Sequence, residues 1–265
     1  MDSPFRNGDL VNVLGVRIHA ESMSSAVDRV ILWARAPRGT PKTVYVSGVH
    51  GIMECRTSPA FREVLNSADL NVPDGMPMVW IGRLSGFKGM TRVFGPDFML
   101  EAMKKSSGER MSHFFFGGKE GVASDLETVA LTGFPGLRSA GSYTPPFRSL
   151  TESEKESIIQ KINAAAPDFL WVGLSTPKQE SWVREMRSSL KAGVIIAVGA
   201  AFDYNTGRLK RAPYWMQQLG LEWAYRLWQE PIRLFKRYAV NIPMFIFFAL
   251  MQLCGIKKYP QVGEL

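Results

Sequence analysis

The chain has 265 residues, of which 46% are hydrophobic and 21% are charged, so it is long enough to bury a substantial core. Its two cysteines, Cys55 and Cys254, form neither a CxxC pair nor a disulfide framework, which excludes a disulfide-stapled secreted fold and favours a reducing compartment. The formal net charge is +8, and most of it arises between residues 208 and 258, where there are nine basic side chains and two acidic ones.

Short β-branched or aromatic runs alternate with longer amphipathic stretches before this basic segment. Strands are predicted at residues 12–18, 43–47, 69–72, 111–116, 137–141, 169–173 and 193–198. Helices are predicted at residues 22–34, at 97–105 behind Pro96, and after Thr151, which forms a capping box with Glu154. The alternation predicts an α/β fold with a Rossmann-like, open, mostly parallel sheet flanked by helices. We assign residues 1–205 to this domain and 206–265 to a helical C-terminal appendage.

Polar residues follow the predicted strands, at the carboxyl edge where such sheets bind ligands. They include Ser47, His50, Asp74, Gln179 and Asp203. For Asp74 two interpretations stay open, a turn or N-cap residue and a general base that faces a pocket beside a glycine. Two interpretations also stay open for Gln179 and Asp203. Each is either a solvated residue at the end of an element or a ligand for a sugar or diphosphate.

Two further motifs limit the chemistry. The turn Gly117-Gly118-Lys119 lacks both the GxGxxG and the GxxxxGK[ST] spacing, so a dinucleotide or Walker fingerprint is not supported. None of the three histidines has a partner at metal-ligand spacing, and the sequence has no DxD pair. We therefore expect no metal site and no cofactor.

The C-terminal segment interleaves Trp, Tyr and Arg and then continues into the apolar run 242–251. This composition is typical of helices at a membrane interface, and a buried helical hairpin is the alternative. Asn241, Pro243 and Gln252 bracket an apolar stretch that is shorter than the roughly 20 residues needed to span a bilayer. We expect the appendage to lie on an anionic membrane surface.

Several of these motifs together resemble the WecG/TagA/CpsF glycosyltransferases. The resemblance covers nearly the whole chain and is carried by the segments 66–75, 92–97, 116–119, 173–182, 199–203, 211–213, 220–223, 225–227 and 230–231. It implies a Rossmann-like, metal-independent, inverting enzyme. Such an enzyme moves a sugar from a UDP-sugar to a polyprenyl-diphosphate-linked saccharide used for cell-surface polymers.

The resemblance also implies roles for individual residues. Asp74 is implied as the catalytic base. The residues implied to line the substrate pocket are Arg92, Asp97, Gln179 and Asp203, and those implied to reach the diphosphates from the appendage are Arg211, Arg226 and Arg233. Preorganised cations would stabilise the UDP leaving group in place of a metal.

One departure from the family pattern concerns the donor sugar. Many members carry Thr-x-Asn where this chain has Val46-Ser47-Gly48, and the members that transfer N-acetylmannosamine use those side chains. Ser47 supplies a hydroxyl and His50 lies nearby in the sequence, so UDP-glucose and UDP-N-acetylmannosamine both remain candidate donors, in exopolysaccharide or other cell-surface polysaccharide synthesis.

Two other classes of function are weighed against this one. A basic nucleic-acid-binding protein is the main alternative, but basic residues that alternate with Trp, Leu and Phe suit lipid better than a duplex groove. A nucleotide-binding oxidoreductase would need the missing glycine fingerprint. Residues 1–9 show no secretory signal, so we expect a peripheral protein on the cytoplasmic face of the bacterial inner membrane. Homo-oligomer formation stays open.

Overall fold

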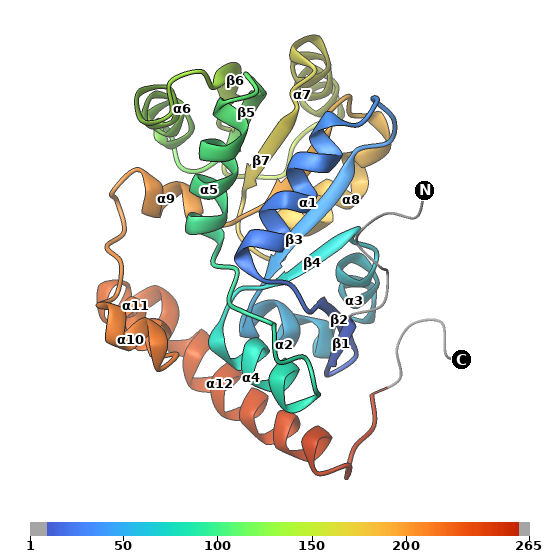
Figure 1. Cartoon of the computed structure of the whole chain (residues 1–265), viewed down its shortest axis with the longest axis vertical. Coiled ribbons are helices and arrows are strands. Elements are labelled where there is room, and N and C mark those ends of the chain that lie inside the picture. Colours follow the sequence, from blue (N-terminus) through green and yellow to red (C-terminus); the bar gives the residue numbers. More distant parts are fainter. Residues whose placement is uncertain (1–9, 260–265) are drawn as a thin grey trace. The chain divides into compact units, whose positions relative to one another are not determined.

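The computed structural model describes residues 10–259 of the chain (Figure 1). These residues divide into two compact units. Within residues 10–259, the first unit comprises residues 10–23, Ser47–Phe94 and residues 209–259, and the second comprises Ser24–Val46 and Gly95–Arg208. Three separate chain segments thus build the first unit. The division into residues 1–205 and 206–265 stays a prediction.

Six strands form the main sheet of the chain. They are β3 (Lys42–Ser47), β4 (Leu70–Pro73), β5 (Ser112–Gly117), β6 (Arg138–Tyr143), β7 (Phe169–Gly173) and β8 (Val194–Ala197), in the order β4-β3-β8-β7-β5-β6. The pairs β3/β8, β8/β7, β7/β5 and β5/β6 are parallel. The first four residues of β7 and all of β8 are buried, as expected for parallel strands covered on both faces. The predicted Rossmann-like α/β class is confirmed.

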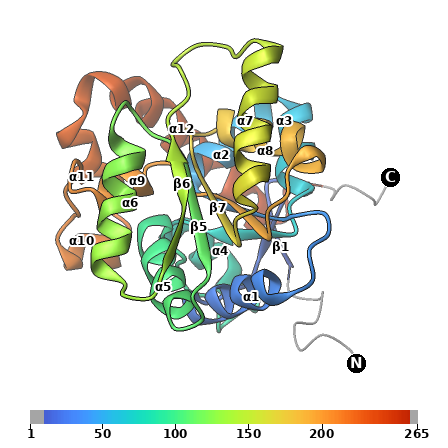
Figure 2. The same cartoon turned by 90° about the horizontal axis from the view of Figure 1, so that it is seen from above.

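Helices cover both faces of the sheet strands in the second unit. They are α1 (Met23–Arg35), α5 (Gly95–Ser107), α6 (Val122–Gly133), α7 (Glu152–Ala165), α8 (Lys178–Met186) and the short α9 (Ala201–Asn205). Figure 2 shows α1 and α5 on one face of the strands and α7 and α8 on the other. This arrangement follows from right-handed crossovers between parallel strands.

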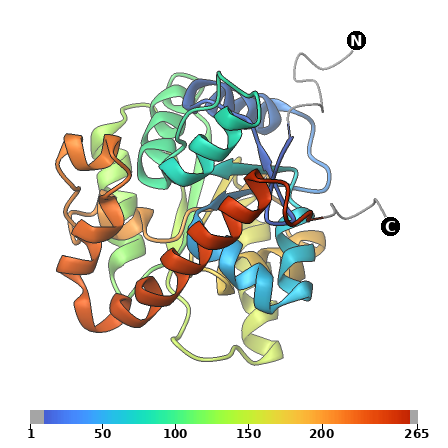
Figure 3. The ribbon, with the colours of Figure 1, turned by 90° about the horizontal axis from the view of Figure 1, so that it is seen from below.

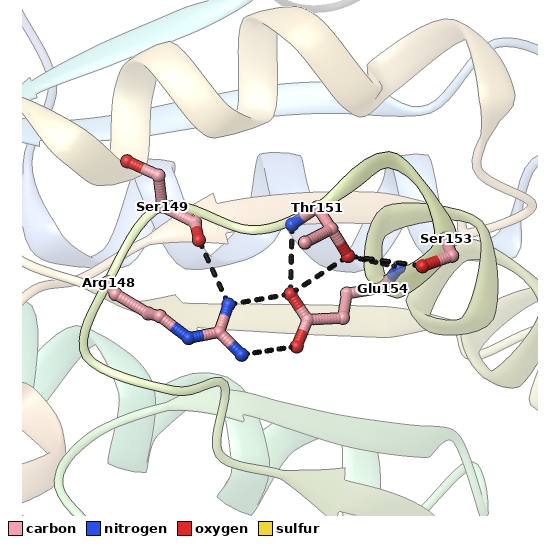
Figure 4. Close-up of polar contacts among 5 residues, drawn as sticks. All are labelled: Arg148, Ser149, Thr151, Ser153 and Glu154. Atoms are coloured by element: carbon pink, nitrogen blue, oxygen red, sulfur yellow. Dashed lines mark hydrogen bonds and ion pairs between the residues drawn. The ribbon is translucent and has the colours of Figure 1, made fainter.

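The predicted capping box at the start of α7 is present (Figure 4). The Thr151 hydroxyl accepts from the Glu154 N–H at 3.3 Å, and the Glu154 carboxylate accepts from the Thr151 N–H at 2.8 Å. The Arg148 guanidinium also binds this carboxylate, through two hydrogen bonds of 2.7 and 2.8 Å. Arg148, together with the Thr151 bonds, lowers the pKa of Glu154 to about 2. The helix start is therefore fixed by charge as well as by the cap.

The first unit begins with a hairpin where a single strand was predicted at residues 12–18. Strands β1 (Leu10–Val13) and β2 (Val16–His19) are antiparallel and pair Val13 with Val16. The two residues between them, Leu14 and Gly15, both have positive φ, 52° and 87°, as a two-residue hairpin turn of the primed type requires. The Asn12 side chain accepts the Gly15 N–H at 2.8 Å, which stabilises the turn. The single-strand prediction is wrong because the turn has only one glycine to mark it.

Six helices complete the described part of the first unit. They are α2 (Val49–Thr57), α3 (Pro59–Asn66), α4 (Met76–Leu84), α10 (Tyr214–Gln218), α11 (Glu222–Gln229) and α12 (Pro231–Leu253). Helix α12, the long red helix in Figure 3, packs against α2 and α11. It runs through Asn241 and Pro243 without a break. The helix therefore extends beyond the predicted apolar run 242–251 at both ends. Pro243 is exposed, so water can bind the carbonyl that its missing N–H leaves unpaired.

Helix α12 is amphipathic and is held to its own unit at both ends of its apolar part. Leu234, Phe245 and Ala249 are its buried residues. The Asn241 amide lies 3.3 Å from His50 Nδ1 of α2. The Gln252 amide donates to the Asn12 carbonyl at 2.6 Å and accepts the Leu14 N–H at 2.9 Å, which joins the helix end to the hairpin.

Among residues 10–259, α12 is the one helix long and apolar enough to cross a bilayer, a test that core helices of soluble proteins also pass. Only 17% of the apolar 18-residue stretch of α12 that passes this test is buried. A large apolar face is therefore left exposed on this helix.

Candidate active site

Asp74 lies where the chain turns from β4 into α4. Its N–H donates to the Ser47 carbonyl at 3.0 Å, so the ends of β3 and β4 meet at this residue. A side-chain carbon added at Gly48 would stand 3.6 Å from Asp74 Oδ2. The glycine therefore leaves one side of the carboxylate uncovered. Asp74 is half-buried at the carboxyl end of a strand, as predicted.

Ser47 and His50 flank this position in the first unit. Ser47 ends β3 and is 4% exposed. His50 is in the first turn of α2, where its Nδ1 faces Asn241 of α12 and lies 3.6 Å from the Glu54 carboxylate. The ring thus connects α2 to α12. The structure brings Ser47 and Asp74 together through the backbone, and it gives His50 an additional packing role.

Arg92 is paired with a residue that the sequence did not single out. Its guanidinium forms an ion pair with the Glu222 carboxylate at the start of α11 and lies 4.1 Å from the centre of the Phe94 ring. Both side chains of the pair are about six-sevenths buried, at 15% and 14% exposure. Arg92 Nε and Glu222 Oε1 have no hydrogen-bond partner among residues 10–259. Unused polar atoms at a buried ion pair leave capacity for a ligand.

The three appendage arginines have different surroundings. The Arg211 guanidinium lies over the Phe94 ring, 4.8 Å from the ring centre. Arg92 contacts the same ring. Arg226 and Arg233 both pair with Glu230, the former at 3.5 Å. Burial raises the pKa of Glu230, but these arginines outweigh burial and hold it below its ordinary value. The structure therefore brings Arg226 and Arg233 together at one glutamate.

Arg237 joins this cluster, and the sequence analysis missed it. Burial and then the charges of Arg233 and Arg226 lower the pKa of the Arg237 guanidinium, and the same three cations oppose the effect of burial on the pKa of Tyr238. The spacing of Arg233 and Arg237, four residues apart on one helix, is the signal that would have found it. Converging cations that are partly buried favour an anionic ligand.

Gln179 and its neighbour form a buried polar cluster in the second unit. Gln179 is in the first turn of α8, is 2% exposed, and donates from Nε2 to Glu180 Oε1 at 2.9 Å. Thr176 donates to the same Glu180 oxygen at 2.7 Å. Burial raises the pKa of Glu180, against the opposing effect of these two hydrogen bonds. Within residues 10–259, Gln179 Oε1 and Glu180 Oε2 are buried without a hydrogen-bond partner.

Asp97 and Asp203 lie on two elements of the second unit that pack together, α5 and α9. Each is half-buried and in the first turn of its helix, where the backbone dipole favours a carboxylate. The Asn205 amide of α9 donates to the Pro96 carbonyl at 3.2 Å. The start of α5 is thereby fixed beside α9, next to the end of β8. The structure brings these two predicted residues onto adjacent elements.

The polar side chains described above make no cluster of metal-ligand type. Residues 10–259 contain no group of three or more His, Cys, Asp and Glu side chains that is arranged to hold a metal ion. The described residues instead offer a carboxylate at a strand end, buried amide and carboxyl groups, and a concentration of guanidinium groups. Such a set can accept a proton and bind phosphate oxygens.

Comparison with known proteins gives one family and several relatives. The sequence profile of the Glycosyl transferase WecG/TagA/CpsF family matches residues 11–259. An N-acetylglucosaminyldiphosphoundecaprenol N-acetyl-beta-D-mannosaminyltransferase of Bacillus spizizenii strain W23 is 30% identical over 212 residues, 80% of each chain. A protein of the same name from Bacillus subtilis strain 168 is 30% identical over 190 residues, 72% of each chain.

Proposed function

Because the chain belongs to the WecG/TagA/CpsF family of glycosyltransferases, we propose that it moves a hexose from a UDP-sugar to a polyprenyl-diphosphate-linked saccharide in cell-surface polysaccharide synthesis. The observation that carries the proposal is the position of Asp74, at the joined ends of β3 and β4 with its carboxylate beside Gly48. The names of the two Bacillus relatives specify a diphosphoundecaprenol-linked acceptor, which supports the acceptor class.

In the proposed reaction Asp74 is the general base. Its carboxylate takes the proton of the acceptor hydroxyl while the hydroxyl oxygen attacks the anomeric carbon of the donor sugar. A new C–O bond forms on the face opposite the departing phosphate, the bond from the anomeric carbon to UDP breaks, and UDP leaves with the electron pair. A single displacement of this kind inverts the configuration at the anomeric carbon.

The leaving diphosphate needs positive charge, and we assign that role to arginines. The proposed set is Arg92, Arg211, Arg226 and Arg233, and we add Arg237 because its charge interacts with those of Arg233 and Arg226. Guanidinium groups bind phosphate oxygens through two parallel hydrogen bonds and stay charged at any relevant pH. This supports metal-independent transfer. In the second unit, Asp97, Gln179 and Asp203 are proposed to contact substrate.

Membrane association is proposed through the exposed face of α10, α11 and α12. Its exposed apolar residues are Tyr214, Trp215, Leu219, Trp223, Trp228, Ile232, Phe235, Val240, Met244, Ile246, Phe247, Leu250 and Leu253. Basic residues of the same helices can meet anionic head groups. Hydrogen bonds at Asn241 and Gln252 hold α12 to its unit. They support a helix that lies on the bilayer, because a spanning helix would break them.

The experiment that tests the function is a donor panel. The purified chain is incubated with UDP-glucose, UDP-N-acetylmannosamine or another UDP-hexose, and a polyprenyl-diphosphate-linked saccharide, with and without chelator. We expect a product heavier by one sugar residue with one donor, equally in both conditions. Absence of product with every UDP-sugar contradicts the proposed function, and product only with added Mg²⁺ or Mn²⁺ contradicts metal independence alone.

A further inference from the structure

The buried cluster at the start of α8 contains one group to which the proposed mechanism gives no role. Glu180 is 1% exposed, and no basic side chain is paired with it in the described structure. Burial raises the pKa of its carboxyl group, against the opposing effect of two hydrogen bonds from neighbouring side chains. Its Oε1 accepts two hydrogen bonds, from Thr176 Oγ1 and Gln179 Nε2.

These hydrogen bonds decide which way the Gln179 amide points. Rotation of an amide by half a turn exchanges its oxygen and its nitrogen with little change in shape. Glu180 Oε1, as an acceptor, selects the orientation in which Nε2 is turned toward it. The carbonyl oxygen of Gln179 is then turned away from Glu180, and it has no donor within residues 10–259.

The space beside this amide is bounded by a glycine. A side-chain carbon at Gly199, which follows β8, would stand 3.6 Å from Gln179 Oε1 and 3.7 Å from Nε2; apart from the two chain neighbours, no other atom of residues 10–259 would lie within 4 Å. The space over Gly199 is therefore open toward the Gln179 amide. A buried acceptor without a donor is costly in the ligand-free protein, and a ligand donor arriving over Gly199 would satisfy it.

We propose that Glu180 is a positioning residue for sugar transfer, which turns the Gln179 amide so that its carbonyl oxygen accepts a hydrogen bond from a hydroxyl or N–H group of the bound sugar nucleotide. The inference rests on the proposed function, since it takes the ligand to be a UDP-sugar. Within residues 10–259, the hydrogen-bond partners of the Glu180 carboxyl group are Thr176 and Gln179.

The test compares two replacements of nearly equal size. Glu180→Leu keeps the volume but removes the acceptor, so the Gln179 amide loses its fixed orientation. Glu180→Gln restores a neutral acceptor at the same place. We expect Glu180→Leu to lower kcat/KM for the UDP-sugar about ten-fold or more, and Glu180→Gln to restore it to within about three-fold of wild type. Glu185→Gln, on an exposed residue of the same helix, is the control and should behave as wild type.

A double-mutant cycle separates positioning from general loss of structure. If Glu180 acts through Gln179, the variant Gln179→Leu with Glu180→Leu should be no less active than Gln179→Leu alone. Thermal unfolding of each variant verifies that it is folded. The binding of UDP then identifies the ligand group: unchanged UDP affinity in Glu180→Leu places the donor on the sugar, and weakened affinity places it on the nucleotide.

Three results would overturn the inference. They are wild-type kcat/KM in Glu180→Leu, a Glu180→Gln variant as impaired as Glu180→Leu, and fully additive losses in the cycle. A wild-type protein that transfers no sugar contradicts the proposed function, and the inference falls with it. A wild-type protein that transfers sugar beside an equally active Glu180→Leu variant contradicts the inference alone.

Discussion

At the scale of single residues, Asp74 and His113 show how position determines what a titratable side chain does. Asp74 is half-buried at a strand end beside a glycine, where a carboxylate can meet a ligand. His113, in β5, is fully buried, accepts a hydrogen bond from Trp171 Nε1 at 2.9 Å and lies 2.9 Å from the Ser106 hydroxyl. The indole N–H requires a lone pair on Nδ1, so the ring is neutral with its proton on Nε2. The first residue suits chemistry and the second suits packing.

Replacement of Asp74 by asparagine should remove sugar transfer and leave the fold intact. The amide has the same shape but cannot take the proton of the acceptor hydroxyl, so we expect kcat to fall by about 10² to 10⁴. Initial rates with saturating donor measure the effect. Asp28→Asn, on the surface of α1, is the control and should keep the wild-type rate. Turnover close to wild type in Asp74→Asn would remove Asp74 from the role of base.

The buried histidine makes the stability of the fold depend on pH. Burial lowers the pKa of His113 to about 3, against an ordinary value of 6.5. Between these two pH values, the histidine is protonated in the unfolded chain and neutral in the folded chain. The contribution of His113 to the free energy of unfolding is fully present above pH 6.5. It decreases as the pH falls from 6.5 toward 3, by roughly 4–5 kcal/mol at most. Urea unfolding at pH 7 and pH 5 should therefore show that the free energy of unfolding decreases more for wild type than for His113→Gln. Parallel losses in the two proteins would contradict this.

At the scale of elements, α12 combines two roles that the sequence could not separate. Its buried residues, Leu234, Phe245 and Ala249, belong to the core of the first unit, while a second set of apolar residues stays exposed. Contacts such as the Arg56 guanidinium 3.3 Å from the Phe248 ring centre connect it to α2. Deletion of residues 208–265 would therefore remove part of a core as well as the face proposed to bind membranes. Point substitutions on the exposed face are the cleaner test.

Polar substitutions on that face should release the protein from membranes. Ile246 and Leu250 are 53% and 55% exposed and four residues apart on α12. We expect Ile246→Asn with Leu250→Asn to weaken binding to vesicles that contain anionic lipid, measured by flotation, because polar amides do not enter the acyl boundary. Added salt should weaken wild-type binding too, since basic residues contribute. Leu131→Asn, on exposed α6, is the control. Equal flotation of all three proteins would refute the role of α12.

At the scale of the whole molecule, local patterns predicted most elements and few of the long-range contacts. The strands of the second unit were predicted because β-branched and aromatic runs favour strands. The start of α7 was predicted because a capping box is a local sequence signal. The turn at Leu14 was missed because leucine rarely has positive φ. The strand-end rule selected Asp74, which directly follows β4, and its role as a base stays a prediction. The pairing of Arg92 with Glu222 was not predictable, because it joins residues 130 positions apart.

The first unit also constrains how the protein is made. The hydrogen bond between Asn12 and Gln252 joins residues 240 positions apart, so the hairpin cannot form this contact until residue 252 has been synthesised. At 5 to 20 residues per second the wait is about 12 to 50 seconds. The segment Gly95–Arg208, which supplies most of the second unit, has emerged well before then. Completion of the unit that carries Asp74 thus follows the synthesis of α12, the helix proposed to bind lipid, so a chain terminated before α12 carries Asp74 in an unfinished fold.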